Sequence, residues 1–198
     1  MTIGTAHLRE SPSQTAGPYV HLGLVPNLAG LGGPWAEDLG ARVIEDGARG
    51  ERASVTGRIT DGLGVAVGDA IVEVWQADAN GRFRGEEGAD PSCRGFGRAS
   101  CDGDGRFRFD TVRPGPVPWT DGTPQAPHLT LWIVARGINV GLHTRLYFAD
   151  DPRNEADPLL SRIQPALRRD TLIARETDGA WHLPIRLQGE GETVFLDM

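Results

Sequence analysis

The sequence of 198 residues contains only two cysteines, Cys93 and Cys101, and no long run of apolar residues. Two cysteines cannot build a disulfide framework and lack the spacing of metal ligands, so we expect reduced thiols, with a single short-loop disulfide as the open alternative. Residues 1–7 lack a basic segment followed by an apolar stretch, and no segment is apolar and long enough to cross a bilayer. We therefore expect a cytoplasmic protein without a secretory signal or membrane span.

The sequence also lacks an excess of basic residues. It has 20 lysine and arginine residues against 27 aspartate and glutamate residues, which gives a formal net charge of -7 at pH 7. Binding to nucleic-acid phosphates requires a basic surface, and the Arg168-Arg169 pair is too short to supply one, so we expect no nucleic-acid partner. Neither a Gly-x-Ser-x-Gly motif nor a Gly-x-x-x-x-Gly-Lys loop occurs, so hydrolase and nucleotide-binding functions have no support.

Glycine and proline are abundant, with 27 and 14 residues, and 39% of the chain is hydrophobic. This composition is typical of a soluble globular chain with many turns, and the length is enough for one substantial core. Residues 1–52 show little periodicity, so we predict an extended N-terminal arm with loops that packs against another surface, and one short helix near 34–40. Residues 53–198 are predicted to form one structural unit built from strands.

Alternation of apolar and polar residues predicts the strands of this unit. Residues 54–60 and 70–75 alternate on either side of the turn Asp61-Gly62-Leu63-Gly64. Further strands are predicted at 106–110, 129–135, 143–148, 181–187 and 193–196. A short helix is predicted at 161–169, where Pro165 limits its length. Strand signals at short intervals indicate an all-β fold, a β-sandwich of mixed or antiparallel strands with an N-terminal arm and long loops.

Three segments resemble the stretches that carry the iron ligands in intradiol ring-cleaving dioxygenases: Trp75–Phe83, Pro114–Trp119 and Ala126–Thr130. That family has two tyrosines and a His-x-His pair at the ligand positions. The corresponding positions of this chain hold Phe83, Val117, His128 and Thr130. Ferric iron prefers anionic oxygen and imidazole ligands, and phenylalanine and valine have no donor atom. The two tyrosines, Tyr19 and Tyr147, lie outside these positions, so we expect no metal and no catalytic residue on this chain, and His128 is interpreted as a core or interface histidine.

Other runs extend the resemblance over nearly the whole chain: Ser13–Tyr19, Glu73–Gly81, Ala135–Asn139, His143–Phe148 and Gln188–Thr193. Together they resemble the alpha type of subunit in those intradiol enzymes that are built from two homologous chains. The resemblance implies that a homologous beta subunit holds Fe(III) and that alpha-beta pairs form a higher-order oligomer. It also implies that the assembly, but not the isolated chain, cleaves protocatechuate with O2 to 3-carboxy-cis,cis-muconate.

The same resemblance implies five substrate-binding residues: Arg136 and, from the arm, Thr15, Gly17, Pro18 and Tyr19. Protocatechuate is a catechol that bears a carboxylate, and the planar, permanently charged guanidinium of Arg136 suits a carboxylate through two parallel hydrogen bonds. Glycine and proline allow a ring to approach the backbone closely, Thr15 offers a hydroxyl donor, and Tyr19 suits the wall of a pocket. Without this context, Arg136 would be interpreted as a solvated arginine at a strand end, and Gly17-Pro18 as an ordinary turn.

Two alternatives stay open at this point. One is a purely structural partner that stabilises the iron-bearing subunit without touching the substrate, and the other is a free-standing β-sandwich binding module. The kinetics of an Arg136 variant separate the first alternative from a substrate-binding subunit. Trp75 and Trp119 are interpreted as packing residues, and the resemblance gives His143 no role as a replacement ligand.

Overall fold

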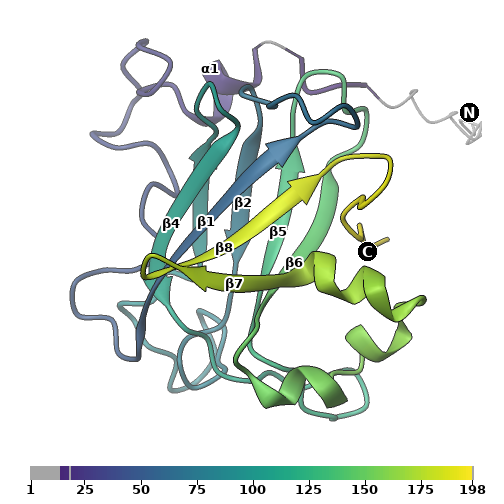
Figure 1. Ribbon diagram of the computed structural model, residues 1–198. Helices are drawn as coiled ribbons and strands as arrows, with labels where there is room; N and C mark the ends of the chain where they lie inside the picture. Colours follow the sequence, from purple (N-terminus) through teal and green to yellow (C-terminus); the bar gives the residue numbers. More distant parts are fainter. Residues whose placement is uncertain (1–13, 18, 198) are drawn as a thin grey trace, which may run out of the picture.

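The computed structural model describes residues 14–17 and 19–197 and consists mainly of strands (Figure 1). The strands of this part of the chain are β1 (Arg52–Thr60), β2 (Ile71–Trp75), β3 (Phe96–Ser100), β4 (Arg106–Val112), β5 (His128–Val134), β6 (Leu142–Phe148), β7 (Ile173–Thr177) and β8 (Ala180–Arg186). Hydrogen bonds join them in the order β3-β2-β5-β6-β7-β8-β1-β4. The pairs β1–β8 and β6–β7 are parallel and the others are antiparallel. The predicted all-β sandwich with mixed strands is confirmed.

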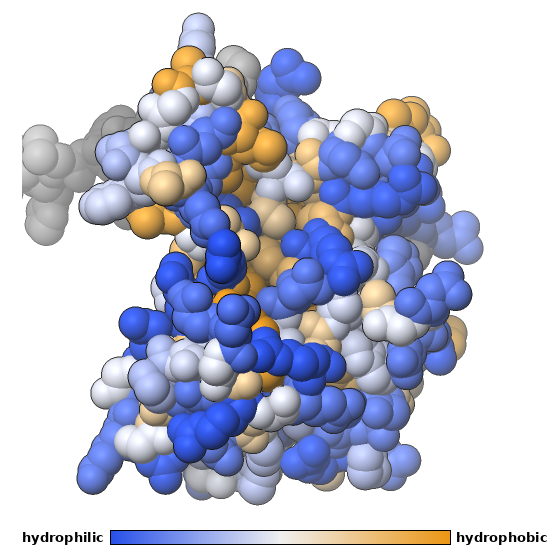
Figure 2. All heavy atoms as spheres, turned by 90° about the vertical axis from the view of Figure 1, so that its left-hand side faces the viewer, coloured by the Kyte–Doolittle hydropathy of each residue, from blue (hydrophilic) through white to orange (hydrophobic). Residues whose placement is uncertain are grey.

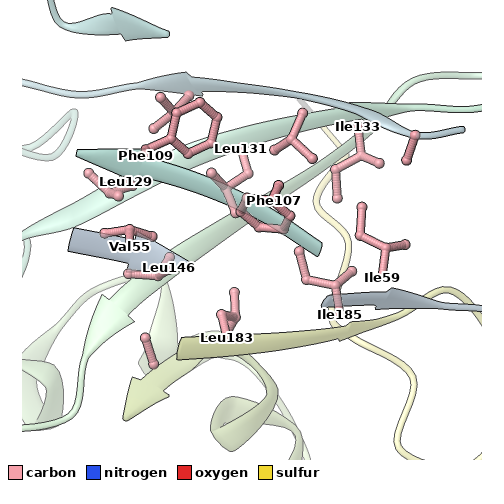
Figure 3. Packing of buried hydrophobic residues seen from close by; sticks show 14 of the residues in the cluster. Val55, Ile59, Phe107, Phe109, Leu129, Leu131, Ile133, Leu146, Leu183 and Ile185 are labelled. Carbon is pink, nitrogen blue, oxygen red and sulfur yellow. The ribbon is translucent and has the colours of Figure 1, made fainter. Parts of the chain in front are cut away.

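The sheet folds over on itself, so that β3, β2, β5 and β6 form one layer and β7, β8, β1 and β4 form the other. Figure 3 shows side chains from both layers, among them Leu131 and Ile185, that point toward one another in the space between them. In β1 the buried residues Val55, Gly57 and Ile59 alternate with more exposed ones, because successive side chains of a strand point to opposite faces. The ring of Phe107 lies directly over Gly57, where any side chain would collide with it. Alternation in the sequence therefore corresponds to one buried face per layer.

Helical structure in the described residues is confined to short segments: α1 (Val20–Leu24) and the 3-10 turns η1 (Pro152–Ala156), η2 (Leu160–Arg162) and η3 (Ala166–Leu172). The predicted helix near 34–40 is wrong, because that stretch forms bends and turns. There the Asp38 carboxylate accepts hydrogen bonds from the backbone amides of Asn27 and Leu28, at 2.9 and 3.0 Å, and so holds an irregular loop. No helix among the described residues is long and apolar enough to cross a membrane.

Two strands were missed by the sequence analysis, and one predicted strand does not form. Both β3 and β7 lack regular alternation between buried and exposed residues. The stretch predicted as a strand at 193–196 forms only an isolated bridge, between Leu196 and His143. Both cysteine thiols are free in the structure.

The edge strands β3 and β4 flank an open side of the sandwich. Leu28, Ala99 and Arg108 line two adjoining hollows there. Figure 2 looks onto this side of the molecule and shows a hollow with hydrophobic residues at its floor. The edge of β4 presents the exposed charged residues Arg106, Arg108 and Asp110. Charges along an edge strand oppose pairing with a strand of another molecule, so the open side does not by itself promote aggregation.

Candidate functional site

The four positions that hold iron ligands in the resembling family converge in space. They line one small cavity of about 40 Å³, together with residues from the end of β2 and the loops around it. The lining residues are Trp75, Gln76, Ala77, Phe83, Gly115, Val117, His128 and Thr130. They come from three segments, 75–83, 115–117 and 128–130, and the first is separated from the second by β3 and β4, so only the fold brings them together. The sequence comparison of these positions therefore corresponds to a real local site.

A tight turn after β2 holds Phe83 at this cavity. The buried carboxylate of Asp78 accepts hydrogen bonds from the backbone amides of Asn80 and Arg82, at 2.8 and 3.0 Å. Gly81 lies within this turn with a φ of 76°, and a side chain there would collide with the carbonyl oxygen of Pro116. The turn and the loop that carries Val117 are thus packed directly against each other.

The side chains at the four positions do not fit ferric iron. Phe83 and Val117 offer hydrocarbon, Thr130 offers a neutral hydroxyl, and His128 supplies one imidazole. The Nδ1 atom of His128 lies 2.8 Å from the carbonyl oxygen of Ala126, which can only accept, so Nδ1 carries the proton. A single neutral imidazole among apolar groups makes a packed cavity and not a four-ligand metal centre.

Tyr147 is close to this cavity, and its ring centroid lies 5.4 Å from that of His128. Its hydroxyl, however, is already hydrogen-bonded to other residues. Its hydroxyl donates a hydrogen bond to Asp157 at 3.2 Å and accepts one from Arg145 at 3.1 Å. Burial raises the pKa of the Tyr147 phenol, which opposes formation of a phenolate. Arg145 also donates to Gln125 at 2.7 Å, so a buried polar network supports the segment that carries His128. The interpretation of His128 as a core residue agrees with these contacts.

The buried imidazole of His128 makes the stability of the fold depend on pH. Burial lowers its pKa to about 4 from the ordinary value of 6.5, and the nearby Arg145 guanidinium acts in the same direction. In the unfolded chain the His128 imidazole therefore takes up a proton near pH 6.5, whereas in the folded chain it does so only near pH 4. Stability from neutral His128 is complete above pH 6.5 and falls, by up to about 3 kcal/mol, as the pH drops from 6.5 to 4.

Denaturant unfolding at pH 7 and at pH 4.5 measures this effect, and His128→Gln is expected to flatten the difference between the two pH values. The same substitution at the more accessible His21 is the control and is expected to keep the wild-type pH dependence. Equal pH dependence in the wild type and in the His128→Gln variant would contradict the assignment.

The structure also brings two of the expected substrate-binding segments together, at the other end of β5. The hydroxyl of Thr15 accepts a hydrogen bond from the Gly137 amide at 2.8 Å and donates one to the Ala135 carbonyl at 3.3 Å. Thr15 thereby binds the backbone on both sides of Arg136. Gly17, with a φ of 69°, turns the chain directly after this contact, and Pro18 lies outside the described residues.

Arg136 and Tyr19 project outward from this end of β5. The Arg136 side chain is 67% exposed, and its Nε atom lies 3.3 Å from a carboxylate oxygen of Asp69. Tyr19 is also largely exposed. Neither residue lines the small cavity. At about 3.3 Å per residue, the six-residue path from Thr130 to Arg136 places the two features roughly 20 Å apart.

The sequence analysis missed an ion pair that joins β3 to β2. Arg98 on β3 donates to Glu73 on β2 from Nε and Nη2, at 2.8 and 2.5 Å, and both side chains are largely buried. Its Nη1 atom donates to the carbonyl oxygen of Leu24, the last residue of α1, at 3.1 Å. Glu73 and Arg98 are cross-strand partners, a relation that becomes visible only once β3 is assigned.

Comparisons with known proteins agree with this geometry. A family model described as "Dioxygenase" matches residues 30–183. The protocatechuate 3,4-dioxygenase alpha chain of Pseudomonas putida is 45% identical over 197 residues, which cover 96% of this chain and 97% of that protein. The corresponding beta chain of Burkholderia cepacia is 37% identical over 152 residues, covering 72% of this chain and 64% of that protein.

Solved structures show the same fold. Hydroxyquinol 1,2-dioxygenase from Pseudomonas putida DLL-E4 has a TM-score of 0.58 at 20% identity, over 93% of this chain and 63% of that one. The family match covers most of the chain, and the positions of the family's metal ligands meet in one cavity. The chain therefore belongs to the intradiol dioxygenase family.

Proposed function

We propose that this chain is the alpha-type subunit of a heteromeric protocatechuate 3,4-dioxygenase in the cytoplasm. A homologous beta-type chain holds Fe(III), and residues 1–52 of this chain pack on that partner. The assembly uses O2 to cleave protocatechuate between its two hydroxylated carbons, which yields 3-carboxy-cis,cis-muconate, and alpha-beta pairs assemble further. The alpha chains at 45% and 36% identity and the homologous beta chain support this proposal.

The observation that carries the proposal is the position of Arg136 relative to the cavity of its own chain. Arg136 is exposed, and it lies roughly 20 Å along β5 from the cavity where the family binds its metal. That distance is too large for one catechol to touch both. Arg136 therefore serves a pocket on another chain, and the chain that suits this role is one with an intact ligand set.

In this proposal the 15–19 segment and Arg136 form one wall of the partner's substrate pocket. The guanidinium binds the substrate carboxylate in two parallel hydrogen bonds, which places the ring for reaction. Thr15 fixes the backbone beside Arg136, and Gly17, Pro18 and Tyr19 approach the ring. This chain binds and orients the substrate, and the substrate atoms that react contact groups of the beta-type chain.

A second candidate is a purely structural partner that does not touch the substrate. The contact between Arg136 and Asp69 favours it, because a guanidinium that already faces a carboxylate on its own chain has less need of a ligand. This contact is largely exposed, and exposed ion pairs contribute only about 0–1 kcal/mol, so a substrate carboxylate can displace Asp69 at low cost. For this reason we prefer the substrate-binding role.

Co-expression with a beta-type chain from the same host tests the proposal. We expect both chains in equal amounts, iron in proportion to the beta-type chain, and oxygen uptake with protocatechuate that disappears when the chains are separated. An active iron-containing assembly formed by this chain alone would contradict the division of roles. A stable chain without iron, activity or partner would favour the stand-alone binding module.

A further inference from the structure

Asp69 lies beside Arg136 at one end of the antiparallel pair β2–β5. The last partners of these two strands at this end are Ile71 and Val134. Asp69 and Arg136 each lie two residues beyond that last pair, one before β2 and the other after β5. A carboxylate oxygen of Asp69 still faces the Arg136 Nε atom at 3.3 Å. The pairing of the strands therefore makes neighbours of two residues that are far apart in the sequence.

The backbone around Asp69 fixes the position of its carboxylate. Gly68 is packed so closely that a Cβ atom on it would lie 2.9 Å from the carbonyl oxygen of Asp102. On the other side of Asp69, the fully buried Ala70 accepts a hydrogen bond from the Cys101 amide at 2.8 Å, through its carbonyl oxygen. Because the aspartate side chain is also short, its charge stays near one point at the end of β2.

The guanidinium of Arg136 is held more loosely than the carboxylate of Asp69. The long side chain of Arg136 is 67% exposed, whereas that of Asp69 is 35% exposed. Their contact is an ion pair only, since the Arg136 side chain makes no hydrogen bond within residues 14–17 and 19–197. Thr15 fixes the backbone on both sides of Arg136 but does not touch its guanidinium. The planar fork is therefore free to turn toward a ligand.

The two carboxylates that Arg136 can meet bind it with different strength. An exposed ion pair such as that with Asp69 favours contact over separation by at most about fivefold. A substrate carboxylate in line with the fork accepts two parallel charge-assisted hydrogen bonds, each roughly twice as strong as a neutral one. Such a substrate displaces Asp69, whereas a ring without a carboxylate has no charge with which to compete.

We infer that Asp69 is a specificity-determining residue, an internal carboxylate that competes with the substrate carboxylate for Arg136. This inference rests on the proposed function and adds a residue that no sequence motif indicated. In the empty pocket Asp69 compensates the charge of Arg136, so an anion gains only the difference between its own contact and that of Asp69. A carboxylate that makes both hydrogen bonds gains most, and a poorly oriented anion gains little.

Removal of the Asp69 charge tests this competition in the assembled enzyme. We expect Asp69→Asn to lower the KM for protocatechuate about two- to fivefold, because the substrate no longer displaces a charged competitor. The KM for catechol, which has no carboxylate, is expected to stay unchanged. The matched control is Asp110→Asn, which removes another exposed aspartate–arginine pair, with Arg108 on β4, and is expected to affect neither substrate.

Inhibitor binding separates recognition of the carboxylate from the chemical step. 4-Hydroxybenzoate has the carboxylate of the substrate but only one hydroxyl, and its inhibition constant is expected to fall in Asp69→Asn by the same factor as the KM. The inhibition constant of phenol is expected to stay unchanged. In an Arg136→Ala background, Asp69→Asn is expected to have no further effect, because the competition requires the guanidinium. A merely structural role of Asp69 would show neither dependence.

The sign of the change decides between competition and positioning. A higher KM for protocatechuate in Asp69→Asn would mean that Asp69 orients Arg136 for the substrate, and it would overturn the inference, as would an unchanged KM. Either result, together with a selective loss for protocatechuate in Arg136→Ala, leaves the proposed function intact. Equal effects of Arg136→Ala on protocatechuate and catechol would instead remove the proposed substrate contact and the inference with it.

Discussion

Replacing Arg136 by alanine is expected to raise the KM for protocatechuate in the assembled enzyme by roughly 30- to 150-fold. The variant loses a charge-assisted pair of hydrogen bonds to the substrate carboxylate, which contributes about 2–3 kcal/mol. Catechol itself has no carboxylate, so its KM is expected to change little. Steady-state oxygen uptake with both substrates measures the difference.

The controls for this experiment separate recognition of the carboxylate from general damage. Arg136→Lys keeps the charge but not the planar fork, so we expect an intermediate loss. Arg175→Ala removes an exposed arginine on β7 and is expected to leave both substrates unaffected. Equal losses for protocatechuate and catechol in Arg136→Ala would reject the carboxylate role and favour the purely structural partner.

Replacing Arg98 by alanine is expected to destabilise the chain by about 3–5 kcal/mol, because it leaves the largely buried Glu73 carboxylate without its partner. The substitution also removes the hydrogen bond to the Leu24 carbonyl, which joins α1 to the sheet. We therefore expect faster amide exchange in residues 20–25, while the centre of β5 stays protected. Denaturant unfolding and hydrogen exchange measure the two effects.

The matched control removes both charges at once. In Arg98→Met combined with Glu73→Gln, no buried charge is left unpaired, so most of the lost stability is expected to return. The hydrogen bond to Leu24 is absent from this double variant too, so fast exchange in residues 20–25 is expected to persist. If the double variant were as unstable as Arg98→Ala, the unpaired carboxylate would not be the cause of the loss.

Most of the sandwich was predictable because one face of each main strand is buried. Alternation, and for β5 a nearly continuous apolar run, located β1, β2, β4, β5, β6 and β8 to within a few residues. It missed β3, where Gly97 takes a core position and polar neighbours are half-buried, and β7, which pairs with β6 over only two residues. It also misplaced the N-terminal helix, because the hydrogen bonds of Asp38 to distant amides leave no periodic trace in the sequence.

The candidate sites likewise include residues that the sequence indicated and residues that only the structure revealed. The motifs pointed to Arg136, Thr15 and the four altered ligand positions, and side-chain chemistry alone excludes a four-ligand iron site at those positions. No motif pointed to the ion pair between Arg98 and Glu73. This pair depends on β2 and β3 being neighbours, and the order of strands in a sheet is set by burial of residues far apart along the chain.

The sequence by itself determined what each position can do chemically: which side chains can hold a metal, which can bind a carboxylate, and that the net charge is acidic. The tertiary structure alone decided where these chemistries meet. It gathered Phe83, Val117, His128 and Thr130 into one cavity and placed Arg136 at the far end of β5. The physical reason is that donor atoms and charges belong to single residues, whereas distance and exposure follow from the register and order of the strands, which the buried core sets.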